Sequence, residues 1–188
     1  AARDRQLKAD LNRVLQEALV PAVRASAVVE LEEAPAALLA EARASLSEDP
    51  LRAYHRAKEA LRRSPQDPAA AQLLEQARAA LAQPEPEPAG DLASRFKAGD
   101  LDGALKTVNH QLRAEPEDPK LLRKAVFLLG TLAQVQASRG KWGEAKEHLQ
   151  HARALFPQDR AWNARIYLLD RIPSQPKAEQ AGWIALLW

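Results

Sequence analysis

One stretch of the sequence occurs twice in related form, at residues 99–118 and again at residues 140–159. Self-similarity at a fixed spacing is typical of proteins built from stacked helix pairs, which expose an extended binding surface rather than a closed catalytic pocket. The repeat therefore favours a helical fold and a function that depends on partners. A shift of 41 residues aligns Gly99 with Gly140, Ala104 with Ala145, Val108 with Leu149, His110 with His151, Pro116 with Pro157 and Asp118 with Asp159.

The composition also favours an all-α fold. Alanine and leucine dominate the apolar residues, aromatic residues make up only 5% of the chain, and there are 7 glycines. This suits closely packed helices better than a β-sheet. With 188 residues the chain can form one domain or two small ones. It contains no cysteine, which excludes disulfides, thiolate zinc sites and cysteine nucleophiles.

Aspartate, proline and glycine mark where helices begin and end. Asp-Pro pairs at residues 49–50, 67–68 and 118–119 each precede a helix-forming run. The aspartate accepts hydrogen bonds from first-turn amides, and proline fits the first helical position. Gly99 and Gly140 each lie between two such runs, where a tight turn needs a left-handed backbone. These signals predict helices over residues 36–47, 50–63, 68–82, 91–98, 101–114, 119–139, 142–155, 160–171 and 177–187.

The N-terminal region and the middle of the chain differ from the repeats. The leucines of Leu7–Leu19 fall on one face and predict an amphipathic helix. Residues 26–33 are rich in valine, so an extended segment is an alternative there, but the helical neighbours favour a helix. The alternating prolines of residues 83–90 (QPEPEPAG) forbid a helix and predict a semi-rigid extended connector.

This organisation predicts three parts. Residues 1–82 form an N-terminal helical region with one degenerate helix pair, residues 83–90 a Pro-rich linker, and residues 91–188 a helical array that ends in a capping helix. The alternative for residues 83–90 is a surface loop within one continuous array.

The repeated residues resemble the tetratricopeptide repeat, a helix-turn-helix unit of about 34 residues. Small side chains such as Ala133 and Ala145 let helices approach closely, and Leu132 fills the space between them. Two features depart from the family: Gln136 stands where an aromatic residue is usual, and a first helix lengthened to 119–139 is needed to absorb the longer spacing. The better copy matches the family at Leu129, Leu132, Ala133, Gly140, Ala145, Leu149, Ala152 and Pro157, the other copy keeps Gly99, Ala104, Val108 and Pro116, and Ala53, Ala57, Ala60 and Pro65 preserve only the second-helix spacing.

The resemblance implies a right-handed solenoid of antiparallel helix pairs. Such a scaffold binds a peptide or protein segment, commonly in the concave groove lined by the first helix of each pair. Lys120, Arg123 and Lys124, at the start of the long helix, are candidate contacts for an acidic partner. Family members that grip a peptide carboxylate also use asparagine on that face. Because no asparagine accompanies these three residues, the resemblance does not imply that they bind a peptide carboxylate. The alternative to partner contacts is that the three are ordinary solvated charges.

Aromatic residues near the C-terminus are further candidate partner contacts. Trp162 and Tyr167 lie on the helix after Asp159, and Trp183 and Trp188 belong to an unusually apolar tail over residues 181–188 (AGWIALLW). Three interpretations of the tail stay open: a capping helix folded over the last repeat, an interaction surface, or a segment that precedes further structure.

Catalytic and metal-binding patterns are weak. His148 and His151 lie three residues apart with Glu144 and Glu147 a turn away, but without a second converging cluster, incidental exposed histidines are the favoured interpretation. No serine, histidine and acid set and no glycine-rich phosphate loop can be singled out. We predict no catalytic residue, no cofactor-binding residue and no metal ligand.

The sequence also disfavours nucleic-acid binding and a membrane-spanning helix. The formal net charge is +2 and no concentrated basic face can be recognised. The longest apolar run, residues 125–137, contains two glutamines and is too short to cross a bilayer.

We therefore predict a non-enzymatic adaptor that binds a peptide or protein partner. The alternatives are a self-associating structural module, with Leu7–Leu19 and the apolar tail as homo-oligomer contacts, and a regulatory or substrate-presenting domain of a larger enzyme. The sequence begins at Ala1 and lacks methionine, which predicts a piece of a longer polypeptide. Its abundance of Ala, Arg, Leu and Pro suits a bacterial assembly or secretion complex, in the cytoplasm or the periplasm.

Overall fold

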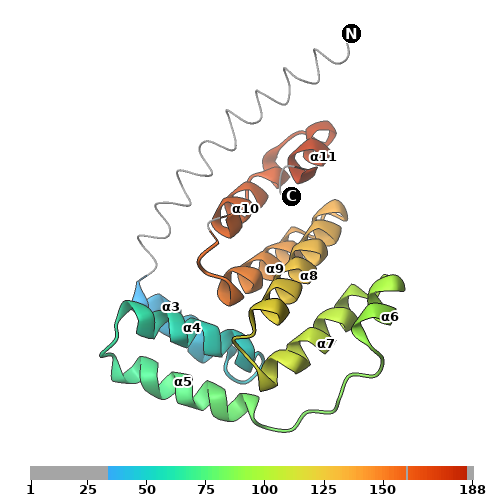
Figure 1. Cartoon of the computed structure of the whole chain (residues 1–188). Coiled ribbons are helices and arrows are strands. Elements are labelled where there is room, and N and C mark those ends of the chain that lie inside the picture. The colour runs from blue at the N-terminus through green and yellow to red at the C-terminus, as the bar shows by residue number, and fades with distance from the viewer. Residues whose placement is uncertain (1–33, 160, 186–188) are drawn as a thin grey trace. The chain divides into compact units, whose positions relative to one another are not determined.

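The computed structural model describes residues 34–159 and 161–185. Within these ranges the chain forms nine α-helices and one short 3-10 helix, and it contains no strand (Figure 1). The predicted all-α class is thus confirmed for this part of the chain, while a solenoid of repeats stays a prediction. The helices are α3 (Pro35–Ser45), α4 (Pro50–Arg63), α5 (Pro68–Leu81), α6 (Leu92–Lys97), α7 (Leu101–Ala114), α8 (Pro119–Ser138), α9 (Trp142–Leu155), α10 (Ala161–Leu169), η2 (Ile172–Ser174) and α11 (Lys177–Ala185).

The predicted helices begin and end within two residues of the observed bounds in the described ranges. One of the larger differences is at α10, which ends at Leu169 although the helix was expected to continue to residue 171. Pro173 accounts for the difference, because the residue before a proline avoids the α conformation and the chain turns into the short helix η2 instead. The helices predicted over Leu7–Leu19 and residues 26–33 lie outside the described residues.

The aspartate caps form as predicted. The Asp49 side chain accepts a hydrogen bond from the Arg52 amide at 3.0 Å, and Asp159 accepts one from the Ala161 amide at 2.9 Å. Asp67 accepts two, from the amides of Ala69 and Ala70. Each cap satisfies amides of the first helical turn that have no partner within their own helix.

The cap at Asp67 gives a test of this account. Asp67→Ala is expected to lower the free energy of unfolding by about 1 kcal/mol, because two first-turn amides of α5 lose their acceptor. Urea denaturation followed by circular dichroism measures the difference. Asp67→Asn keeps a capping oxygen and serves as the matched control, and equal losses in the two variants would contradict the assignment.

The glycine turns also form as predicted. Gly99 and Gly140 have φ angles of 73° and 74°, in the left-handed region that glycine adopts without a steric penalty. Each lies between the end of one helix and the start of the next, α6 and α7 at Gly99 and α8 and α9 at Gly140. The two copies of the repeat therefore share the same turn geometry.

The described residues fall into two compact units. The first contains residues 34–132 together with 151–157, and the second contains residues 133–150 and the described residues from 158 onward. The Pro-rich segment 83–90 lies within the first unit, where residues 84–88 have no regular secondary structure and connect α5 to α6 (Figure 1). The three-part division expected from the sequence stays a prediction.

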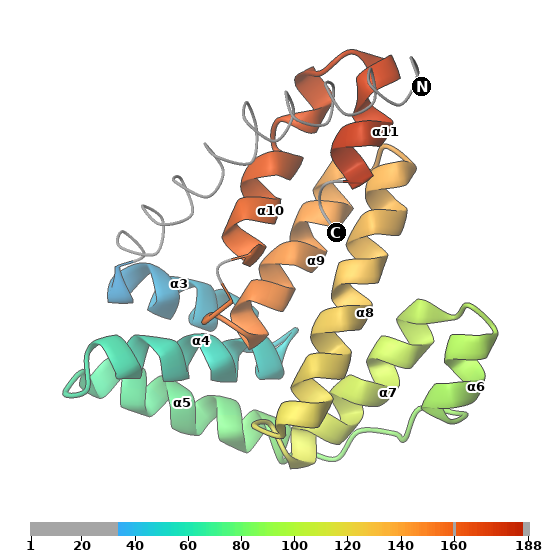
Figure 2. The same ribbon diagram turned by 45° about the horizontal axis from the view of Figure 1, so that its top comes forward.

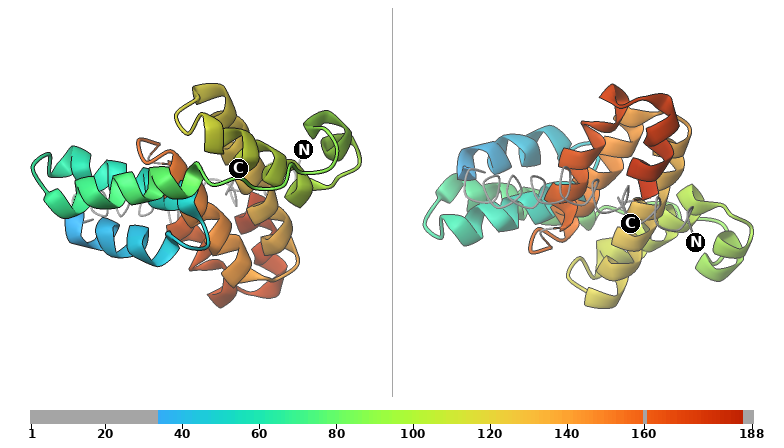
Figure 3. Two further views of the ribbon diagram at one scale, coloured as in Figure 1. Left: turned by 90° about the horizontal axis from the view of Figure 1, so that it is seen from below. Right: turned by 90° about the horizontal axis from the view of Figure 1, so that it is seen from above.

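Helix α4 is the centre of the first unit. It packs against α3 and α5 and also contacts α7, and the three helices α3, α4 and α5 lie side by side when seen from above and below (Figure 3). Its alanines at positions 53, 57 and 60 are fully buried, which lets the neighbouring helices approach closely. Unusually for a core helix, α4 also buries His55, Arg56 and Glu59.

The second unit is built around α10, η2 and α11. η2 contacts both helices, and Ile172 within it is completely buried. Leu168 and Leu169 at the end of α10 are buried as well. A capping role for α11 stays a prediction. None of the helices in the described ranges has the length and apolarity that crossing a bilayer would require.

Candidate partner-binding surface

Helix α6 is short and buries none of its residues. It begins at Asp91, whose carboxylate accepts hydrogen bonds from the Ser94 amide at 3.0 Å and the Ser94 hydroxyl at 2.7 Å. These bonds lower the pKa of Asp91. α6 packs on α7 (Figure 2). Even so, Phe96 stays 47% exposed. α6 therefore presents apolar side chains that stay partly open to solvent.

Helix α8 carries a mixed stripe of charged and aromatic residues. It begins at Asp118, whose carboxylate accepts hydrogen bonds from the amides of Lys120 and Leu121. Lys120, Lys124 and Phe127 follow at spacings of four and three residues, so they lie on one face of the helix. All three are exposed, Phe127 to 60%.

The exposed faces of α6 and α8 meet. The rings of Phe96 and Phe127 have centroids 6.2 Å apart and are inclined by 39°. Beside them lies an open hollow of about 420 Å³, which we call the α6–α8 surface. A contiguous apolar hollow with charged residues at its edge is typical of an interaction site. It is lined by Leu92, Ala93, Phe96, Lys97, Lys124, Phe127 and Leu128.

The charges at this surface are predominantly positive. Lys97 and Lys124 line the hollow, and Lys120 lies one turn before Lys124. The acidic groups Asp91 and Asp118 precede α6 and α8 as their caps. The pKa of Asp118 is lowered by the amides of Leu121 and Lys120 and further by the charges of Lys120 and Lys124. Because Asp118 caps the helix, its carboxylate is already used by the backbone of α8.

No family model, curated protein or solved structure matches this chain. The assignment of a site therefore depends on the geometry of the described residues alone.

The predicted contacts Lys120, Arg123 and Lys124 are all exposed on the first turns of α8. Lys124 lines the hollow, whereas Lys120 and Arg123 continue the same face of the helix without lining it. The structure thus brings one of the three into direct contact with an apolar site that the sequence did not indicate.

Three of the aromatic residues that we predicted as partner contacts, Trp162, Tyr167 and Trp183, belong to the second unit. Trp162 and Trp183 are buried, and Tyr167 is half-buried with the guanidinium of Arg171 over its ring at 4.2 Å. The guanidinium of Arg165 lies 4.5 Å from the ring of Trp162. Trp188 lies outside the described residues. Partner contacts through these four residues stay a prediction.

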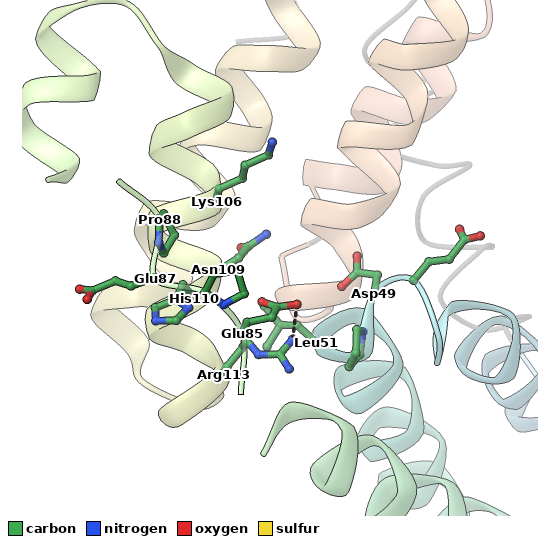
Figure 4. Close-up of a pocket in the computed structure, with 12 residues that line it drawn as sticks. Asp49, Leu51, Glu85, Glu87, Pro88, Lys106, Asn109, His110 and Arg113 are labelled. Carbon is green, nitrogen blue, oxygen red and sulfur yellow. Dashed lines mark ion pairs between the residues drawn. The ribbon is translucent and has the colours of Figure 1, made fainter. Parts of the chain in front are cut away.

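A second, more polar pocket of about 700 Å³ lies between the start of α4, the Pro-rich segment and α7 (Figure 4). Its most buried cation, Arg113, donates hydrogen bonds to the carbonyls of Ala80 and Gln83 at 2.9 and 3.1 Å and lies 3.1 Å from a carboxylate oxygen of Glu85. Arg113 therefore holds the Pro-rich segment to α7, and its charge has a structural role in this contact.

The rest of this pocket does not define a ligand. The walls carry Asp49 and Glu87 as well as Lys106, and Asn109 and His110 come from the same helix as Lys106 (Figure 4). Charges of both signs are spread around the opening without converging on one point. In the described residues no cluster of His, Asp and Glu is arranged to hold a metal ion.

Phe96 and Phe127 were the residues that sequence reasoning missed. Phe127 continues the stripe begun by Lys120 and Lys124, so an aromatic residue in an otherwise charged face was the available signal. Phe96 lies in a six-residue helix, which is too short to build an apolar face of its own against a neighbour.

Proposed function

We propose that this chain is a non-enzymatic scaffold that binds a peptide or protein segment at the α6–α8 surface. The observation that carries the proposal is the pair of exposed phenylalanines, Phe96 and Phe127, beside an apolar hollow of about 420 Å³. Monomeric proteins rarely leave contiguous apolar patches open to water unless a partner covers them.

The resemblance to tetratricopeptide repeats supports the same surface. In that family the groove is commonly lined by the first helix of each pair. Helix α6 precedes the Gly99 turn and α8 precedes the Gly140 turn, so each is the first helix of its copy. The hollow lies between these two helices, where a repeat scaffold would present its groove.

Burial of the two exposed phenylalanines by a partner would also contribute favourable binding energy. Aromatic side chains dominate the binding energy of many interfaces, because they bury a large area at a small cost in conformational entropy. Phe96 and Phe127 are exposed before binding, and a partner that covers both rings would remove most of their remaining contact with water. Lys97 and Lys124 at the edge would then form the polar rim.

The test uses a double variant, Phe96→Ser with Phe127→Ser. Peptides are selected on the wild-type chain from a displayed library of random helical segments, and their Kd values are measured by fluorescence anisotropy. We expect the double variant to bind the selected peptides at least about tenfold more weakly, since each phenylalanine is expected to be an energetic anchor.

The matched control is Lys106→Ser, an exposed position on α7 at the polar pocket. It should leave the Kd unchanged. The proposal would be wrong if no peptide is enriched, or if the enriched peptides bind the double variant as tightly as the wild type.

A further inference from the structure

We propose that the segment bound at the α6–α8 surface is an amphipathic helix that carries acidic side chains beside its apolar face. This inference rests on the proposed function and adds the chemistry of the partner.

Four cations lie at or beside the hollow. Lys97 and Lys124 line it, and Lys120 and Arg123 share the exposed face of α8. The ion pairs found in the described residues join other groups, and none of them uses these four side chains. Their charges are therefore available to carboxylates of a partner, which would form charge-assisted hydrogen bonds with them.

The shape of the site favours a helix as the occupant. The hollow lies between two helices and is lined mainly by apolar side chains, with Lys97 and Lys124 at its edge. This is the arrangement in which an amphipathic helix lays its apolar face into a groove. It offers no row of free backbone groups to which an extended strand could pair, because its walls are the helical segments α6 and α8.

The spacing along α8 sets the position of the acidic residues in the partner. Lys124 precedes Phe127 by three residues, so the backbone positions of the two residues are about one turn, roughly 5 Å, apart along the helix. Lys120 lies a further turn away. A partner whose carboxylates lie one and two turns from its apolar anchors would meet Lys124 and Lys120 while its anchors contact Phe127.

Two other occupants fit the observations less well. A second copy of this chain, bound through a two-fold contact, would bring the same cations face to face, and like charges across an interface are unfavourable. An anionic membrane would attract the lysines, but insertion into lipid requires apolar side chains on a protruding face. The apolar side chains here surround a hollow.

The experiment compares two synthetic helical peptides with identical apolar residues. One carries glutamates at the flanking positions, and the other carries lysines at the same positions. Binding to the wild-type chain is measured by fluorescence anisotropy at low and at high salt. We expect the glutamate peptide to bind at least about tenfold more tightly than the lysine peptide, with a difference that shrinks as salt is added.

The decisive variant reverses two charges, Lys97→Glu with Lys124→Glu. It should reverse the preference, so that the lysine peptide binds more tightly than the glutamate peptide. Both positions are exposed, and Lys120→Glu with Lys124→Glu repeats the test if the first pair disturbs α6.

The outcomes separate the two proposals. If both peptides bind with equal Kd values and both require Phe127, the charge inference is wrong and the proposed function stands. If neither peptide binds in a way that depends on Phe127, the proposed function fails. Tighter binding to vesicles of anionic lipid than to the glutamate peptide overturns the inference in favour of a membrane surface. Light scattering that shows a dimer lost in Phe96→Ser with Phe127→Ser overturns it in favour of a second copy.

Discussion

Glu41→Gln is expected to lower the free energy of unfolding by about 3 kcal/mol, the lower end of the range measured when one partner of a buried ion pair is removed, because Arg56 is buried and Glu41 is partly exposed. Arg56 on α4 is only 1% exposed, and its Nε lies 2.9 Å from Oε2 of Glu41 on α3. The other carboxylate oxygen accepts hydrogen bonds from Nε and Nη2 of Arg52 at 3.1 and 2.5 Å. The substitution keeps the side-chain shape and removes the negative charge that faces a buried guanidinium.

The electrostatics of Glu41 agree with this role. Burial raises the pKa of its carboxyl group, but the charge of Arg56, the hydrogen bond from Arg52 and the charges of Arg52 and Arg153 outweigh burial and hold the pKa below its usual value. The ionised form of Glu41 therefore stabilises the folded chain, and the stabilisation is lost as the pH falls through the lowered pKa.

Two controls make the Glu41 result specific. Glu75 pairs with Arg78 at 2.7 Å on the exposed side of α5, so Glu75→Gln removes the same charge from a solvated pair and should cost less than about 1 kcal/mol. Adding Arg56→Met to Glu41→Gln should recover part of the lost stability, because the buried guanidinium that faced the carboxylate is then gone as well. Denaturant unfolding measures the free energy of unfolding of the wild type, of the two single variants and of the double variant. A loss at Glu41 no larger than the loss at Glu75 would contradict the account.

The helices could be predicted from the sequence because their ends depend on local chemistry. The Asp-Pro pairs and the turn glycines fix where each helix begins and ends, whatever packs against it. The aspartates at 49, 67, 118 and 159 all cap as expected. The two-residue difference at the end of α10 came from overlooking Pro173, which is itself a local signal.

The burial of α4 could not be predicted in the same way. Its sequence, PLRAYHRAKEALRR, has charges in every turn and would suit a solvated helix. The structure places it at the centre of the first unit because Ala53, Ala57 and Ala60 form a narrow face for α3 and α5. Its buried charges are paired, Arg56 with Glu41 on α3 and Glu59 with arginines of α4 itself. Partners such as Glu41, eleven residues before Arg52, carry no signal within α4 itself.

The candidate surface was predicted only in part, for a related reason. The charges of Lys120 and Lys124 are visible in the sequence, but the apolar half of the site depends on two helices meeting in space. Phe96 and Phe127 are 31 positions apart and no periodicity connects them. Their 6.2 Å approach is a tertiary contact, so it follows from the packing of α6 and α8 and not from either helix alone.

A stability loss of about 3 kcal/mol is expected when the pH falls from 6.5 to 4, and His55 is the group responsible. His55 is 8% exposed on α4. Burial lowers its pKa to about 4, and the charge of Lys58 adds to the effect. The backbone of Pro116 and the charge of Glu117 oppose the shift, whereas the nearby His151 reinforces it.

The sign follows from where the proton binds. Below the ordinary pKa of 6.5 the unfolded chain takes up a proton at His55, while the folded chain does not until about pH 4. The unfolded state is therefore stabilised relative to the folded state throughout this interval, by about 1.4 kcal/mol per pH unit, and the effect levels off below it. Carboxylates with lowered pKa values, such as Glu41 and Glu117, lose their stabilising charge only at lower pH, below about 4.5.

Denaturant unfolding at a series of pH values tests the assignment. The wild-type free energy of unfolding should fall steadily between pH 6.5 and about pH 5, where the carboxylates contribute little. His55→Gln and His55→Phe should both flatten this part of the curve, whatever their stability at neutral pH, because neither side chain titrates there. The readout is the slope, so a general loss of stability in either variant does not obscure it. An unchanged slope in a folded variant would show that another group binds the proton, and the buried neutral imidazole of α4 would then not limit the acid stability of the first unit.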